Sequence, residues 1–262
     1  MSKDFHTDDL HQASNQLGVS ARNLKGCLIS FEGLDGAGKT TQMDLLERWL
    51  KRHGIPSLRT REPGGTPLGV ELRHLLLGRP DLTITPLAEA FLFQADRAQH
   101  FATVILPALA AGMLVITDRC FDSSIAYQGV AQGVGVTLVK QLSQLATQGH
   151  APDLTILLDL DPALVQVRTG GSRDQERSQE ELLAKRQDGA DDKHRLRVRS
   201  REEPSRFDRK GESFHQCLRE AFLTIAQTDP ERVKVIDATQ PLETVHDEIV
   251  AHVERLLKAS DW

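Results

Sequence analysis

Short apolar runs and longer amphipathic stretches alternate along most of the chain. The apolar runs cover residues 27–31, 114–117, 154–160 and 233–236, with a weaker run at 57–60, and helical periodicity fills the intervals between them. Strands that alternate with helices in this way predict an α/β fold, in which a five-stranded parallel sheet is flanked by helices on both faces.

Polar residues follow four of these runs. In an open parallel sheet, ligands bind beyond the carboxyl ends of the strands. Glu32, Arg61, Asp118 and Asp161 stand at such positions and are therefore candidates for a site.

Two segments depart from the alternation. Residues 1–25 form an N-terminal extension, which we expect to be a flexible, partly ordered tail. Between residues 170 and 204 about half of the side chains are charged and apolar ones are sparse, so this stretch adds little to a core and is typical of a long loop or lid. We therefore predict one domain over residues 26–262, with a lid and its charged insert at about 168–210.

Composition narrows the class of protein. The chain is 39% hydrophobic, enough for a full core, and its net charge of -5 provides no overall field that attracts nucleic acid. No apolar run approaches the roughly 18 residues of a membrane span. Cys27, Cys120 and Cys217 are far apart in sequence, as in a protein of a reducing compartment. We expect a cytoplasmic protein without structural disulfides, nucleic-acid partners or membrane segments.

The most specific motif follows the first predicted strand. Residues 33–40, GLDGAGKT, satisfy G-x-x-x-x-G-K-[ST] and open a helical pattern at 41–51. The glycines let backbone N–H groups converge on phosphate oxygens, Lys39 reaches the terminal phosphates of a nucleotide, and the Thr40 hydroxyl can ligate magnesium. A GTPase is excluded because its Asn-Lys-x-Asp guanine reader is absent, and the only asparagines, Asn15 and Asn23, precede the loop.

Further polar segments follow in a characteristic order. They read EGLDGAGKTT, TREPGGT, FLFQADRAQH, DRCFDSSIAYQG, PDLTILLD and IDATQPLE. In this combination the chain resembles thymidylate kinase from about residue 28 to its C-terminus, apart from the charged insert. The resemblance implies a three-layer P-loop NTPase fold and transfer of the γ-phosphoryl group of ATP to dTMP, with Mg²⁺, to give dTDP in the synthesis of dTTP. It also implies a homodimer formed through helices.

The same resemblance assigns the donor side. The Asp237–Pro241 segment resembles the loop that skirts the adenine, and Thr40 and Asp118 hold Mg²⁺ directly or through water. ATP is held by Gly33, Leu34, Asp35, Gly36, Ala37, Gly38, Lys39, Thr40 and Thr41.

On the acceptor side the resemblance implies a role for each of ten residues. Phe93 stacks on the thymine, Arg97 and Gln128 hydrogen-bond to its polar edge, and Ser124 lies near the base. Arg73 and Arg119 hold the monophosphate, where guanidinium forks suit phosphate oxygens. Glu62 and Pro63 shape that end of the site, Asp35 accepts from the 3′-hydroxyl, and Tyr127 lies against the 2′ carbon and favours deoxyribose.

The catalytic candidates are Lys39, Arg119 and Arg206. Residues 205–208, SRFD, match the Asp-Arg-hydrophobe-Glu lid motif of the family, although the acidic first position is missing. Because the phosphate loop carries no arginine, the chain resembles the bacterial type that supplies this charge from its lid. Arg206 is the candidate, and Arg168 and Arg209 are its competitors.

Two alternatives remain open. The first is a related deoxynucleotide kinase with a different base preference. The second is a non-catalytic nucleotide-binding P-loop protein, suggested by the altered Ser205 and Asp208 of the lid. The intact Lys39, Thr40 and Asp118 argue against the second.

Overall fold

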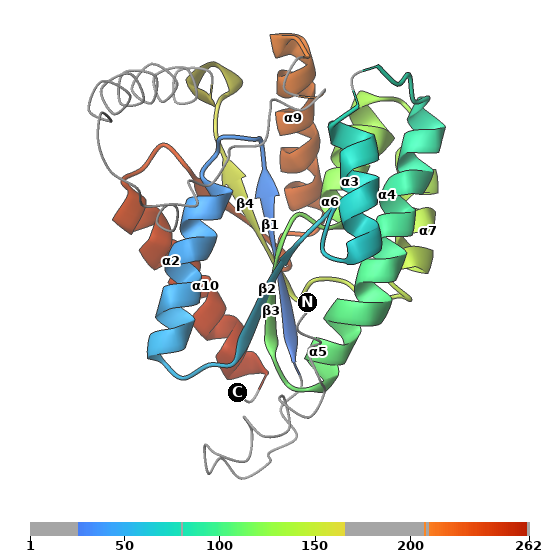
Figure 1. Ribbon diagram of the computed structural model, residues 1–262. Coiled ribbons are helices and arrows are strands. Elements are labelled where there is room, and N and C mark those ends of the chain that lie inside the picture. The colour runs from blue at the N-terminus through green and yellow to red at the C-terminus, as the bar shows by residue number, and fades with distance from the viewer. Residues whose placement is uncertain (1–25, 80, 166–206, 208–209, 261–262) are drawn as a thin grey trace, which may run out of the picture.

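The computed structural model describes residues 26–79, 81–165, 207 and 210–260 (Figure 1). The N-terminal extension, the charged insert and the three arginines considered for the lid lie outside the described residues.

A parallel sheet forms the middle layer of the domain. Its strands are β1 (Cys27–Gly33), β2 (Ser57–Arg61), β3 (Leu114–Asp118), β4 (Leu154–Asp159) and β5 (Val233–Asp237), in the order β2-β3-β1-β4-β5. The five strands expected from the apolar runs are confirmed. Every strand ends one or two residues away from the end of its predicted run. β1 continues through Glu32 and Gly33, so Glu32 lies inside the strand rather than after it. Arg61 and Asp118, which were also expected to follow their strands, are the last residues of β2 and β3.

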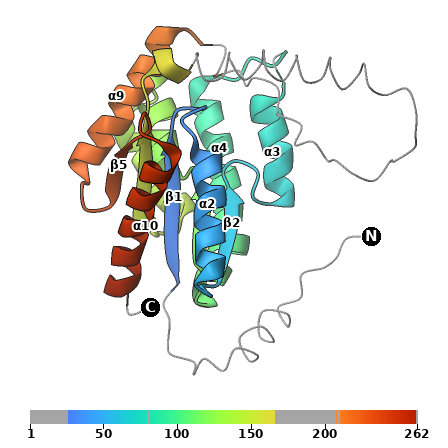
Figure 2. The same ribbon diagram turned by 90° about the vertical axis from the view of Figure 1, so that its left-hand side faces the viewer.

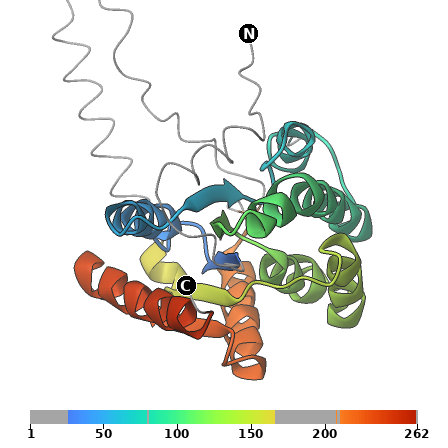
Figure 3. The same cartoon turned by 90° about the horizontal axis from the view of Figure 1, so that it is seen from below.

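Helices cover both faces of the sheet, as Figures 1 and 3 show. On one face lie α2 (Lys39–Arg52) and α10 (Leu242–Ala259), which Figure 2 presents toward the viewer. The other side carries α3 (Pro67–Leu77), α4 (Pro86–His100), α5 (Leu106–Ala110), α6 (Phe121–Ser124), α7 (Val136–Ala146) and α9 (Glu212–Thr228). Two π-helical segments, η1 (Phe101–Ile105) and η2 (Ile125–Ala131), continue α4 and α6. None of the described helices is long and apolar enough to cross a lipid bilayer.

Successive side chains of β1 point to opposite faces of the sheet. Ile29 and Phe31 pack into the cluster formed with α2 and α10, whereas Leu28 packs with residues of η1 and α5. Since side chains alternate along a strand, Ser30 and Glu32 point to the same face as Leu28. Both are fully buried, so this face of the central strand places polar groups inside the domain.

An ion pair between partly exposed Arg232 and the buried carboxylate of Asp122 joins α6 to the residue before β5. The guanidinium of Arg232 donates two hydrogen bonds to Asp122, at 2.6 and 3.0 Å, and one to Thr155 Oγ1 at 2.8 Å. Thr155 Oγ1 in turn lies 2.8 Å from Ser30 Oγ on β1. Removing one partner of such a pair leaves an uncompensated buried charge, which typically costs about 3–5 kcal/mol. The contact therefore holds three strands and α6 in a fixed arrangement.

Candidate active site

The phosphate loop connects β1 to α2 at the carboxyl edge of the sheet, with its glycines in the left-handed region. Gly33 has a φ of 127°, and Gly36 and Gly38 have φ values of 85° and 100°. A Cβ atom at Gly33 would lie 2.4 Å from the carbonyl oxygen of Leu158 on β4, so no side chain fits there. The first motif glycine is therefore required by the backbone of the neighbouring strand.

Lys39 begins α2 and is buried under its own loop. Its Nζ donates to the carbonyl oxygens of Gly33 and Leu34, at 3.1 and 3.0 Å, and lies 3.4 Å from Asp35 Oδ1. The next residues, Thr40 and Thr41, are exposed at the N-terminus of the helix. A helix N-terminus with an ammonium group beside it is a suitable place for phosphate groups.

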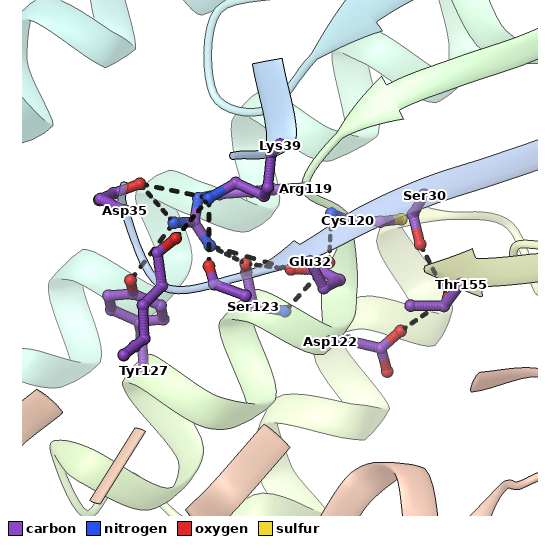
Figure 4. Close-up of polar contacts among 12 residues, drawn as sticks. Ser30, Glu32, Asp35, Lys39, Arg119, Cys120, Asp122, Ser123, Tyr127 and Thr155 are labelled. Atoms are coloured by element: carbon purple, nitrogen blue, oxygen red, sulfur yellow. Dashed lines mark hydrogen bonds and ion pairs between the residues drawn. The ribbon is translucent and has the colours of Figure 1, made fainter. Parts of the chain in front are cut away.

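Arg119 lies against this loop. It follows β3 and has a left-handed backbone, with a φ of 71°. Its Nη2 donates to Asp35 Oδ1 at 2.7 Å, its Nη1 donates to Ser123 Oγ at 2.8 Å, and its guanidinium carbon lies 5.3 Å from the centre of the Tyr127 ring (Figure 4). Desolvation opposes ionisation of Asp35, but the charges of Arg119 and Lys39 outweigh it and hold the pKa of this carboxyl well below its usual range. Loop and arginine thus form one charged cluster.

Glu32 lies beneath Arg119. Its carboxylate is 0% exposed and accepts hydrogen bonds from the Cys120 amide at 2.8 Å and from Ser123 Oγ at 2.6 Å (Figure 4). Burial and then the charge of Asp122 raise the pKa of Glu32 to about 7, although Arg119 and the hydrogen bonds act in the opposite direction. The sequence indicated a site position for Glu32 but no role.

Arg97 of α4 is the centre of a second buried polar cluster. Its Nε donates to Glu62 Oε2 at 2.8 Å, and its Nη1 donates to Gln94 Oε1 at 2.9 Å and to Ser124 Oγ at 3.1 Å. His100 Nδ1 lies 3.0 Å from the other oxygen of Glu62. Burial opposes ionisation of Glu62, but the Arg97 charge and the hydrogen bond with His100 hold its pKa below the usual value. The segments TREPGGT, FLFQADRAQH and DRCFDSSIAYQG therefore meet around Arg97, and the last of them meets the phosphate loop at Arg119.

Phe93 of α4 packs beside the phosphate loop. It is half-buried against the apolar cluster that contains Leu34 of the phosphate loop and Tyr127 of η2. The Tyr127 ring makes edge contacts with Phe207 and Phe214, with ring centres 5.2 and 6.3 Å away. The aromatic residues predicted to bind the base and the sugar thus lie on one continuous apolar wall.

The turn after β2 is held by two helices. Arg73 of α3 donates from Nη1 to the carbonyl oxygen of Pro63 at 3.0 Å. Asp96 of α4 accepts from the Gly64 amide at 3.1 Å, and burial together with the charge of Glu62 raises the pKa of Asp96 to about 6. Arg73 and Pro63, both predicted for the phosphate end, therefore contact each other.

Gln128 has a partner that the sequence did not indicate. Its Nε2 donates to Glu89 Oε1 of α4 at 2.7 Å, and Gln132 donates to the same oxygen at 2.6 Å. Glu89 thus holds Gln128, which was predicted to contact the base, and His100 holds Glu62, which was predicted to shape the phosphate end. Glu89 stands just before FLFQADRAQH and His100 is its last residue, but a buried pairing partner has no motif of its own.

Asp118 offers a carboxylate oxygen to a cation. Its Oδ1 is buried and has no hydrogen-bond partner among the described residues. Carboxylate and hydroxyl oxygens are suitable Mg²⁺ ligands, and Mg²⁺ usually completes its shell with water and substrate phosphates. Within the described ranges no group of three or more His, Cys, Asp or Glu side chains could hold a metal by itself. The residues present fit a metal that arrives with a nucleotide.

The segment after β5 lies beside the start of α2. Asp237 accepts from the amide and hydroxyl of Thr239, at 2.9 and 2.7 Å, and from Gln240 Nε2 at 2.8 Å, which gives the turn a defined shape. Gln42 of α2 donates to the carbonyl oxygen of Leu242 at 3.1 Å. The segment predicted to skirt the adenine is therefore joined to the helix that carries Lys39.

Comparisons with known proteins agree with this arrangement. A family model described as thymidylate kinase matches residues 31–196 and 188–249. A thymidylate kinase of Symbiobacterium thermophilum is 38% identical over 229 residues, which are 87% of this chain and 93% of the relative. One of Leifsonia xyli subsp. xyli is 42% identical over 230 residues, or 87% of this chain and 94% of the relative.

A solved structure supports the same relationship. The crystal structure of thymidylate kinase from Ehrlichia chaffeensis matches with a TM-score of 0.63 and 31% identity, over 87% of this chain and 98% of that chain. With a family model over most of its length and relatives at about 40% identity, the chain belongs to the thymidylate kinase family.

Proposed function

We propose that this thymidylate kinase carries out its reaction between the phosphate loop and Arg119. ATP is the phosphoryl donor, dTMP is the acceptor, and the products are ADP and dTDP. An oxygen of the dTMP phosphate attacks the γ-phosphorus of ATP, and the bond from that phosphorus to the β–γ bridging oxygen breaks. The attacking phosphate oxygen of dTMP is already anionic at neutral pH, so positioning and charge neutralisation matter more than a strong base.

The observation that carries the proposal is the contact between Arg119 and Asp35. It joins a guanidinium suited to an acceptor phosphate to the loop suited to donor phosphates, at 2.7 Å. In our assignment Lys39 and the amides of residues 33–41 bind the ATP phosphates, Arg119 binds the acceptor phosphate, and Asp35 accepts from the 3′-hydroxyl.

The recognition of dTMP is assigned to the wall around Arg97. Phe93 stacks on the thymine, and Arg97, Gln128 and Ser124 contact its polar edge. Tyr127 packs against the deoxyribose. Arg73 with Pro63 and Glu62 closes the phosphate end. Because buried donors reject a base that leaves them unpaired, this arrangement favours thymine over cytosine.

Acceptor choice tests the function directly. We expect ADP release from Mg-ATP to be fastest with dTMP when each deoxynucleoside monophosphate is supplied in turn. Lys39→Ala, which removes the ammonium group under the loop, should lower turnover at least about 10²-fold and serves as the blank. A different preferred acceptor would favour the related kinase of other base preference, and turnover with none would favour a non-catalytic protein.

We assign the Mg²⁺ that accompanies ATP to Thr40 and Asp118. The Thr40 hydroxyl is exposed at the start of α2, and the buried Oδ1 of Asp118 has no partner within the described part of the chain. The metal supplies charge neutralisation at the transferring phosphoryl group.

Asp118→Asn should raise the Mg²⁺ concentration needed for half-maximal turnover roughly tenfold, because a neutral amide replaces the carboxylate near the metal. Asp44→Asn is the matched control, since Asp44 of α2 pairs with Arg59 of β2 and should leave the Mg²⁺ requirement unchanged. Titration of turnover with MgCl₂ at fixed ATP measures both. Equal curves for wild type and Asp118→Asn would remove Asp118 from the metal site.

The lid arginine is assigned to Arg206. The phosphate loop has no arginine of its own, and Phe207, the next residue, is buried against Tyr127 of the acceptor wall. A guanidinium beside the transferring group would offset charge that develops in the transition state.

Arg206→Ala should lower kcat by about 10²-fold with only a modest change in the KM for dTMP, because the lost interaction is made in the transition state. Arg168→Ala and Arg209→Ala should each have a smaller effect on kcat. Steady-state kinetics of the three variants decide between them. If Arg206→Ala keeps wild-type turnover, the role passes to whichever of the other two arginines lowers kcat.

We also propose a homodimer formed through α4 and α7. Leu87 and Phe91 stand one turn apart on α4 and are 45% and 52% exposed. On α7, which packs against α4, Leu138 and Leu145 are 40% and 77% exposed. Apolar side chains gathered on adjacent helices are typical of an oligomer interface.

Light scattering after size exclusion should give the mass of two chains for the wild type. Phe91→Glu should shift the protein toward one chain, because a buried, unpaired carboxylate destabilises an apolar interface. Leu242→Glu is the matched control, since Leu242 is 45% exposed but lies on α10, on the opposite side of the sheet. A single-chain mass for the wild type would exclude the dimer.

A further inference from the structure

Glu32 is a fully buried carboxylate and the only charged residue of β1. It directly precedes Gly33, the first residue of the phosphate loop. A buried charge is costly and is rarely kept without specific partners. Within the described residues, its hydrogen bonds come from one short segment: the Cys120 amide at 2.8 Å, the Ser123 amide at 3.4 Å and Ser123 Oγ at 2.6 Å. That segment follows Arg119 immediately.

The Ser123 hydroxyl connects the Glu32 carboxylate to the Arg119 guanidinium. A hydroxyl has one proton to donate and lone pairs that accept. At 2.6 Å from Glu32 Oε2, Ser123 Oγ gives its proton to the carboxylate and accepts from Arg119 Nη1 at 2.8 Å (Figure 4). The guanidinium can only donate, so Ser123 Oγ accepts from Arg119 and keeps its own proton for Glu32.

The backbone at Arg119 is held by the same group. Arg119 has a φ of 71°, a conformation that residues with a Cβ seldom adopt. The hydrogen bond from the next amide, that of Cys120, to Glu32 Oε1 anchors the turn at this point. On its other side the guanidinium donates to Asp35 at 2.7 Å. Arg119 is thus held between two residues of the β1–phosphate-loop segment.

We propose that Glu32 is a positioning residue, which fixes Arg119 through Ser123 and the Cys120 amide so that the acceptor phosphate faces the donor phosphate loop. This inference rests on the proposed function, since it requires Arg119 to bind the phosphate of dTMP. In this arrangement the Glu32 carboxylate aligns Arg119 with the phosphate loop. Alignment matters because a misplacement of about 1 Å can lower a transfer rate about 10²-fold.

Asp122 provides a matched comparison within the same network. It is also buried, stands next to Ser123 on α6, and carries a carboxylate. Its hydrogen bonds come from Arg232 and Thr155 instead of from the turn at Arg119. A buried carboxylate that only stabilises the fold should therefore behave like Asp122.

A double-mutant cycle tests the inference. Glu32→Gln keeps the size of the side chain and should lower kcat/KM for dTMP about 10²-fold, with the KM for ATP changed less than about twofold. In an Arg119→Ala background the same substitution should change kcat/KM less than about threefold, because its effect passes through Arg119. Equal losses in the two backgrounds would overturn the proposal.

Two further variants separate positioning from stability. Asp122→Asn should lower the Tm as Glu32→Gln does but leave kcat/KM for dTMP within about threefold of wild type. If Glu32→Gln does not fold, Ser123→Ala removes the relay hydroxyl and should show the same dependence on Arg119. A loss independent of Arg119 would again count against the inference. Failure of the wild type itself to phosphorylate dTMP would instead count against the proposed function.

Discussion

The ion pair between Arg119 and Asp35 is the contact on which the arrangement of the site depends. It links residues 84 positions apart in sequence, one in the loop that suits donor phosphates and one in the turn assigned to the acceptor. Phosphoryl transfer requires the two substrates to meet in line, and the protein contributes mainly by holding them there. A short charged contact between the two binding elements provides such a constraint before any ligand binds.

The topology of the sheet brings these elements together. β3 pairs with β1 in parallel, with Phe31 opposite Asp118, so the residues after both strands emerge at the same edge. Adjacent strands lie about 4.8 Å apart, a separation that an arginine side chain spans easily. The polar network of Ser30, Thr155, Asp122 and Arg232 joins β1 to β4, α6 and the residue before β5. Polar contacts as well as an apolar core therefore stabilise the part of the sheet that carries the phosphate loop and Arg119.

Local patterns predicted much of this molecule. Apolar runs predicted β1, β3 and β4 because these inner strands of a doubly covered parallel sheet are buried on both faces, whereas the edge strands β2 and β5 are only partly buried. The phosphate loop was predictable because Gly33 and Gly38 are required by backbone geometry, and Lys39 follows at a fixed offset. The parallel fold followed from the alternation of strands and helices, and the family followed from motifs in a fixed order.

The pairing of polar side chains was not predictable in the same way. That Glu62 binds Arg97, that Glu89 binds Gln128 and that Glu32 holds the turn at Arg119 all depend on which strands are neighbours. The order β2-β3-β1-β4-β5 is not contained in any single apolar run. Glu32 was also expected just after its strand but lies one residue before its end, because β1 extends through Gly33.

The central claim is that Arg119 aligns the acceptor with the donor loop rather than only binding it. Single-turnover transfer of the γ-phosphoryl group of ATP, measured by rapid quench at saturating dTMP, tests this in the wild type and in Arg119→Lys. An ammonium group cannot reach Asp35 and Ser123 at once as the guanidinium fork does, so the account predicts a transfer rate about 10²-fold lower even at saturation. A wild-type rate at saturating dTMP would contradict the account and reduce Arg119 to a binding residue.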